Sequence, residues 1–198
     1  MTATPPRIAD IDPARLTPEQ ARVHDRIAQG PRGRVEGPLR VWLHSPGLAD
    51  RAQALGQYAR YDSQLPPRLS ELAILVTARI WSSGFEWAHH APIALAAGLD
   101  QAAIDAIAAG RIPDLPDAAA RAVFAFAAEL HRDRQVCDTT YAAARAALGE
   151  GALVDLVGIC GYYSLISMTI NAFGVPHGDG PALPALPFPP TDCFRLPG

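Results

Sequence analysis

Apolar residues recur every three to four positions through most of the chain, and no stretch alternates strictly between apolar and polar residues. The first pattern is that of helices with one buried face, whereas strict alternation would indicate strands. Proline, glycine and helix-capping residues divide the chain into blocks of helical length. The sequence therefore predicts an all-α fold, a bundle of about seven or eight helices with short connections.

The helix boundaries follow from these punctuating residues. The first helix is the most sharply marked, because Thr17, Pro18 and Gln20 supply an N-cap, a proline at the first helical position and a capping-box partner. Pro92 should kink the fourth helix or delay its start. The expected helices are 18–29, 46–63, 67–81, 85–98, a short one after Asp100, 118–133, 141–148 and 152–173.

Both ends of the chain depart from this pattern. Residues 1–14 and the proline-rich residues 177–198 cannot form helix interiors. We expect these tails to lie along the surface or to reach onto a neighbouring subunit. The length suits one domain spanning residues 1–198, with its core at about residues 38–175.

Composition narrows the possible functions. The 198 residues carry a net charge of −3, which argues against a nucleic-acid partner. The chain has no lysine, so all 17 basic side chains are arginine, and Schiff-base lysine chemistry and the lysine-containing phosphate loop are excluded. Cys137, Cys160 and Cys193 are widely spaced, which argues against a disulfide framework or a closed zinc site.

Residues 156–176 carry no charge over about the length of a membrane span. Their glycine, tyrosine and hydroxyl side chains, and the lack of flanking arginine clusters, favour a buried central helix instead. The N-terminus has prolines and charges where a signal peptide has its apolar core. We therefore expect a cytoplasmic protein without a membrane partner.

Candidate chemistry is concentrated between residues 71 and 90. Glu86 and His90 are four residues apart, so they share one helix face, where a carboxylate can orient an imidazole for proton transfer. Taken alone, such a pair is more often an exposed salt bridge. Glu71 strengthens the functional interpretation, because it is a carboxylate in an otherwise apolar helix. A single metal ion held by Glu71, Glu86 and His90 is a weaker alternative, since no zinc-type spacing supports it.

At these residues the chain resembles the carboxymuconolactone decarboxylase and alkylhydroperoxidase-D superfamily, over roughly residues 38–110. The resemblance implies an alkylhydroperoxidase-D-like helical fold and a homo-oligomer, a trimer or hexamer. The matching segments are Glu71-Leu72-Ala73-Ile74-Leu75, Phe85-Glu86-Trp87-Ala88-His89-His90 and Ala97-Gly98, with His44-Ser45-Pro46 and Leu65-Pro66-Pro67-Arg68 before them.

The resemblance also implies an activity. The decarboxylase branch works without a cofactor on a carboxylated lactone, so Glu71, Glu86 and His90 are the candidate catalytic residues. We expect His90 to protonate or stabilise the enolate, Glu86 to hold its tautomer and Glu71 to relay the proton. The substrate would be a small molecule, and the candidate residues that bind it are His44, Trp87, Phe85 and Arg40.

Two alternatives stay open. In the peroxidase branch, two cysteines precede the histidine, whereas Ser83 and Glu86 stand at those positions here, which disfavours thiol chemistry. A helical oligomer that only binds a small ligand is the second alternative. One geometric obstacle also exists, because in a level hairpin Glu71 lies about three helical turns from the turn and His90 under two. The two side chains meet only if the helices cross steeply or another element completes the site.

Overall fold

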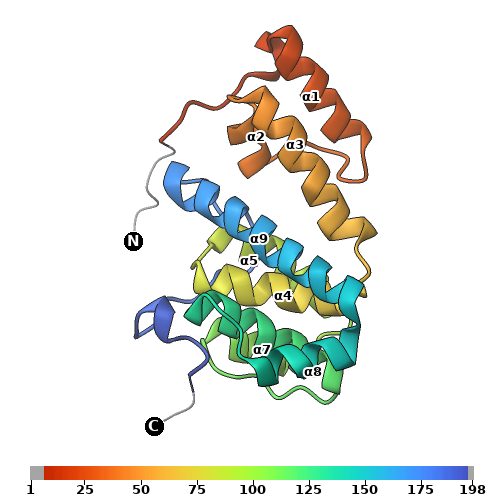
Figure 1. Cartoon of the computed structure of the whole chain (residues 1–198). Coiled ribbons are helices and arrows are strands. Elements are labelled where there is room, and N and C mark those ends of the chain that lie inside the picture. The colour runs from red at the N-terminus through yellow and green to blue at the C-terminus, as the bar shows by residue number, and fades with distance from the viewer. Residues whose placement is uncertain (1–6, 196–198) are drawn as a thin grey trace.

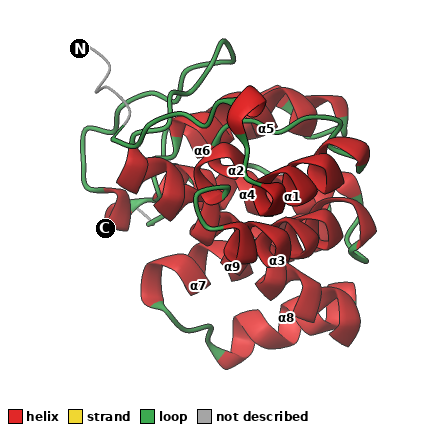
Figure 2. Cartoon of the chain, turned by 90° about the horizontal axis from the view of Figure 1, so that it is seen from above, coloured by secondary structure: helices red, strands yellow, loops and turns green. Residues whose placement is uncertain are grey.

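The computed structural model describes residues 7–195, and over this range Figure 2 shows helices and loops without a strand. The expected all-α fold is confirmed. The described residues contain nine α-helices: α1 Pro18–Gln29, α2 Pro38–Trp42, α3 Pro46–Gln57, α4 Pro67–Ile80, α5 Gly84–Ala96, α6 Gln101–Ala108, α7 Ala118–Asp133, α8 Asp138–Leu148 and α9 Glu150–Phe173.

The additional helix is α2, which the sequence pattern did not reveal. Its five residues are too few to show a periodicity, and it starts at Pro38 after Gly37, whose φ is 53°. The other helices lie close to the expected ranges, with starts and ends shifted by a few residues. Pro92 lies inside α5 and neither delays nor ends the helix.

The largest departure concerns the second expected helix. The regular α3 ends at Gln57, and the chain continues as a five-residue π-helical turn, η2, over Tyr58–Asp62. Such wide turns are rare and often occur at functional sites. Here the turn carries Arg60 and Tyr61 toward a cavity that is described below.

The centre of the bundle is α4, which packs against α5, α7 and α9. Every residue from Leu69 to Arg79 is buried, so α4 has no solvent face. In Figure 1, α9 crosses the middle of the molecule, with α1, α2 and α3 on one side and α4, α7 and α8 on the other. A side chain of α4 can therefore meet partners from several helices.

The charge-free segment expected to be a central helix forms the larger part of α9. By length and composition α9 could cross a membrane, but 61% of its most apolar window is buried inside the protein. It contacts α2, α3, α4, α7 and α8. These contacts are those of a core helix.

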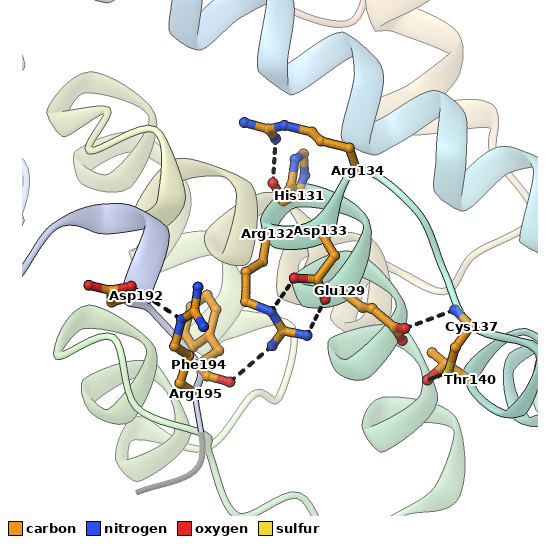
Figure 3. A network of polar contacts seen from close by, with 10 residues as sticks. All are labelled: Glu129, His131, Arg132, Asp133, Arg134, Cys137, Thr140, Asp192, Phe194 and Arg195. Atoms are coloured by element: carbon orange, nitrogen blue, oxygen red, sulfur yellow. Dashed lines mark hydrogen bonds and ion pairs between the residues drawn. The ribbon is translucent and has the colours of Figure 1, made fainter. Parts of the chain in front are cut away.

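The tails run along the surface of their own chain where the structure describes them; residues 1–6 and 196–198 of the expected tails lie outside that range. The C-terminal tail is fixed by several polar contacts. Arg79 Nη1 donates to the Pro184 carbonyl at 2.7 Å, and the Phe194 amide donates to the Gly110 carbonyl at 2.8 Å. Figure 3 shows the last described residues against α7, where Arg132 pairs with Asp133 and reaches the Phe194 carbonyl.

Candidate functional site: a buried histidine between two carboxylates

Glu71 and His90 are in direct contact. His90 Nδ1 donates to Glu71 Oε2 at 2.7 Å, joining α4 to α5 across the turn at Ser82, whose φ is 49°. The two residues lie at different distances from this turn along their helices. The hairpin is therefore not level, and the obstacle raised by the sequence is resolved within a single chain.

Glu86 lies on the opposite side of the same imidazole. Its Oε2 is 3.3 Å from His90 Nε2, within the helix and four residues away, as the spacing predicted. Glu71, Glu86 and His90 are 4%, 3% and 2% exposed, which rules out an exposed surface salt bridge. Glu86 Oε2 is buried and has no hydrogen-bond donor among the described residues, because its contact with His90 is an ion pair without hydrogen-bond geometry.

The flanking carboxylates determine the charge of His90. Burial opposes the imidazolium form, but Glu71 and Glu86 outweigh it and raise the pKa of His90 to about 9. His90 is thus an imidazolium at neutral pH. The adjacent His89 behaves in the opposite way, because burial and the positive charge of His90 lower the pKa of His89 to about 3.

A cavity of about 450 Å³ opens beside this cluster, which is large enough for a small organic acid. Glu86, His90 and the ring of Tyr163 line it, whereas Glu71 does not. Burial, and then Glu86 and Glu71, raise the pKa of Tyr163 well above its usual value, so its phenol stays neutral. The cluster is therefore layered: Glu86 faces the cavity, His90 follows, and Glu71 lies behind His90.

Only one of the four expected substrate-binding residues lines this cavity, and that residue is Phe85. Trp87 lines a different cavity between α5, α6 and the C-terminal tail. His44 is exposed, and its Nε2 contacts the Ala9 carbonyl at 2.9 Å. Arg40 forms a bidentate pair with Asp10 at 2.6 and 2.7 Å and lines a smaller neighbouring cavity. Ala9 and Asp10 thus already contact His44 and Arg40, the two polar side chains that the sequence suggested for binding the substrate.

Other residues at the cavity were missed by the sequence analysis. Arg32 and Arg34 come from the loop between α1 and α2, Arg60 and Tyr61 come from η2, and His89 comes from α5. No spacing rule links residues 32, 60 and 90, because they meet only through the packing of three separate segments. The π-helical turn at η2 is the one local feature that marks this region, and it was not apparent from the sequence.

The metal alternative finds little support in this geometry. No group of three or more histidine, cysteine, aspartate or glutamate side chains within residues 7–195 has an arrangement that could hold a metal ion. Glu71 and Glu86 face the two ring nitrogens of His90.

The three cysteines lie away from the cavity. Cys137 is exposed, while Cys160 and Cys193 are buried, and none of them is among the residues that line the cavity at His90. Burial raises the pKa of Cys160 to about 12 and also raises the pKa of Cys193. Neither buried thiol is disposed to form the thiolate that peroxide reduction requires.

Comparison with known proteins shows which family model and which solved structures this chain resembles. Residues 46–129 match the model of the carboxymuconolactone decarboxylase family, while a search of curated proteins gives no match. A peroxidase-related protein of Silicibacter sp. TM1040, itself uncharacterised, shares the fold with a TM-score of 0.71 at 16% identity, covering 90% of this chain and 97% of that one.

A second solved structure gives the same result. It is a protein of unknown function from Agrobacterium tumefaciens, described as a putative antioxidant defence protein AhpD, with a TM-score of 0.62 at 17% identity. The match covers 74% of this chain and 99% of that one. The family match spans Glu71, Glu86 and His90, and the two solved structures share the fold of this chain, so the comparisons support its resemblance to the carboxymuconolactone decarboxylase and alkylhydroperoxidase-D superfamily.

Proposed function

We propose that this protein is a cofactor-free acid/base enzyme that acts on a small carboxylated, enolisable acid or lactone, by decarboxylation or a related isomerisation. One observation carries the proposal: a buried histidine lies between two carboxylates, and only one of these carboxylates lines a cavity of substrate size. Buried charges of this kind are costly unless they are used, and they are typical of active sites.

In the proposed mechanism, the proton that the substrate carbon receives comes from the side of the cavity formed by His90 and Glu86. In decarboxylation, the bond between the substrate carbon and its carboxylate breaks, carbon dioxide leaves, and the electron pair remains as an enolate. The His90 imidazolium stabilises this anion and supplies the proton to carbon, directly or through Glu86, and solvent then restores the proton. In an isomerisation, the Glu86 carboxylate would first remove a proton from carbon.

Glu71 acts in this mechanism through His90. It accepts the Nδ1 hydrogen bond, and so fixes the orientation of the ring and stabilises its positive charge. Because Glu71 does not line the cavity, we propose it as a positioning residue. The order of proton transfer therefore runs from His90 or Glu86 to substrate, with Glu71 holding the imidazolium in place.

A thiol-dependent peroxidase is the weaker candidate. It is favoured by the name of the antioxidant relative, AhpD, but Ser83 and Glu86 occupy the positions of the two cysteines of that branch. The cysteines that the chain does contain lie away from the cavity, as described above. A purely ligand-binding protein would also need this cavity, but it would not need a charged histidine at its base.

We also propose that the protein acts as a homo-oligomer. Along α9 an uncharged stripe that includes Val154, Val157 and Met168 is exposed, at 70%, 47% and 49%. Such a stripe is typical of helices that pack against another subunit. The number of subunits can be measured by sedimentation equilibrium.

The proposal can be tested by carbon dioxide release from a panel of carboxylated lactones and β-keto acids. We expect metal-stripped wild type to release carbon dioxide from at least one of them. His90→Ala should lower the rate by about 100-fold to 10,000-fold, because it removes the proton donor. His24→Ala, on the surface of α1, is the control and should match wild type.

Two outcomes would contradict the proposal. The first is that no acid in the panel is decarboxylated or isomerised. The second is that His90→Ala turns over substrate at the wild-type rate. Peroxide reduction that is lost on alkylation of the cysteines would favour the thiol alternative instead.

A further inference from the structure

Three arginines converge on the cavity at His90 from outside the α4–α5 hairpin. Arg32 and Arg34 lie in the loop after α1, which precedes the family-matched residues 46–129, and Arg60 lies in η2. After burial and His90, these three positive charges are the next contributors to the lowered pKa of His89. They therefore act on the same wall of the cavity.

The three arginines differ in how their charge is balanced. Arg34 Nε pairs with Glu36 Oε1 at 2.9 Å, and its side chain is 68% exposed. Neither Arg32 nor Arg60 has a carboxylate partner among the described residues. Arg60 lies over the ring of Tyr61, with its Cζ 5.2 Å from the ring centroid. Two guanidinium groups are thus available to an anionic ligand.

Arg32 is also held in position. Its Nη2 donates to the Tyr162 hydroxyl at 3.3 Å, while its Nε is buried without a hydrogen-bond acceptor. Gly56 of α3 makes room for this arrangement, because a Cβ there would lie 2.0 Å from the Tyr162 hydroxyl and 2.5 Å from Arg32 Nη2. A guanidinium that is fixed in advance loses little entropy when it binds a carboxylate.

Glu86 supplies an independent indication of a ligand. It is 3% exposed, lines the same cavity, and has an oxygen without a donor. A ligand that offers a hydrogen atom to Glu86 and an anionic group to the arginines would satisfy both kinds of unpaired atom. The acid/base groups at the base of the cavity and the arginines then contact different parts of one molecule.

Building on the proposed function, we propose that Arg32 and Arg60 form a clamp that binds a carboxylate which the substrate keeps throughout the reaction. An arginine on a departing carboxylate would stabilise the substrate more than the transition state, because carbon dioxide is uncharged. The clamp is therefore suited to an anchoring group, and the reacting carbon lies toward Glu86 and His90. A substrate that loses one carboxylate as carbon dioxide would therefore carry a second carboxylate, which the clamp binds.

The experiment measures binding of unreactive acids, so it does not depend on turnover. Succinate and glutarate are titrated into the full-length protein by calorimetry, with succinamide as the uncharged probe. We expect Arg32→Gln and Arg60→Gln each to weaken dicarboxylate binding about tenfold or more, since each removes a charge-assisted hydrogen-bond donor. Arg22→Gln removes one surface charge from α1 and leaves Asp50 paired with Arg26, so it should bind as wild type does.

Additional variants separate binding from folding. Arg60→Lys and Arg32→Lys keep the charge and should restore part of the affinity, and circular dichroism confirms that each variant is folded. The clamp is refuted if wild type binds no dicarboxylate, if succinamide binds as tightly as succinate, or if both glutamine variants retain wild-type affinity. Dicarboxylate binding without any turnover would support the clamp and count against the proposed function alone.

Discussion

Two buried histidines in this bundle have pKa values that are shifted in opposite directions. His90, on α5, lies between Glu71 and Glu86 at a cavity, and its pKa is raised to about 9. His131, on α7, is also buried, but its Nε2 meets the Thr77 hydroxyl at 2.8 Å, and burial followed by the nearby Arg134 lowers its pKa to about 4. Burial alone therefore does not indicate a catalytic histidine.

The partners account for the difference. The Thr77 hydroxyl donates its one hydrogen to the Ala73 carbonyl at 2.8 Å, so it accepts a hydrogen bond from a neutral His131. This pair joins α7 to the central helix α4 without any charge. The carboxylates beside His90 do the reverse, because they retain a proton on the ring next to the cavity. The comparison predicts different responses to the same substitution.

His90→Leu should have the largest effect. It leaves two buried carboxylates without a cation, which typically lowers the free energy of unfolding by about 3–5 kcal/mol at neutral pH. Urea unfolding measures this loss, and activity should fall with it. A loss below about 1 kcal/mol would mean that the carboxylates are not charged in the absence of His90.

Raising the pH should weaken wild type through the same histidine. The pKa of His90 is higher in the folded protein, at about 9, than the usual 6.5, so its contribution is complete below pH 6.5 and is lost as the pH rises through about 9. The loss is at most about 3.5 kcal/mol, at about 1.4 kcal/mol for each unit between pKa 6.5 and about 9. Urea unfolding from pH 6 to 10 should show this decline in wild type, and His90→Leu should lack it.

His131→Leu should have the smallest effect. It removes one neutral hydrogen bond and leaves the Thr77 bond to Ala73 in place, so the free energy of unfolding should fall by about 1 kcal/mol at pH 7, with kcat unchanged. A large loss of activity would show that the two histidines are coupled.

The dependence of stability on pH below 6.5 gives a second test of the role of His131. Since the pKa of His131 is lower in the folded protein than when unfolded, wild type loses stability as the pH falls from 6.5 toward about 4. His131→Leu should remove that part of the decline. A variant with an unchanged decline between these pH values would contradict the neutral assignment of His131.

Some contacts of the site could be predicted from spacing along the sequence, whereas others depend on how distant segments pack. Glu86 and His90 are one helical turn apart, so their spacing alone predicted the contact now observed at 3.3 Å. Glu71 stood out as a carboxylate in an apolar helix, but its contact with His90 depends on how α4 and α5 pack. Arg40 was a reasonable carboxylate ligand until the N-terminal segment placed Asp10 against it.

The sequence by itself predicted eight of the nine described α-helices, most of their boundaries and the candidate acid/base residues, because hydrophobic periodicity, caps and contacts within one turn are local properties of the chain. The tertiary structure alone decided that Glu71 lies behind His90, that Glu86 faces the cavity, and that Arg32 and Arg60 line the same cavity. These contacts join segments up to about 60 residues apart, and such contacts arise only when the helices bury their apolar faces together.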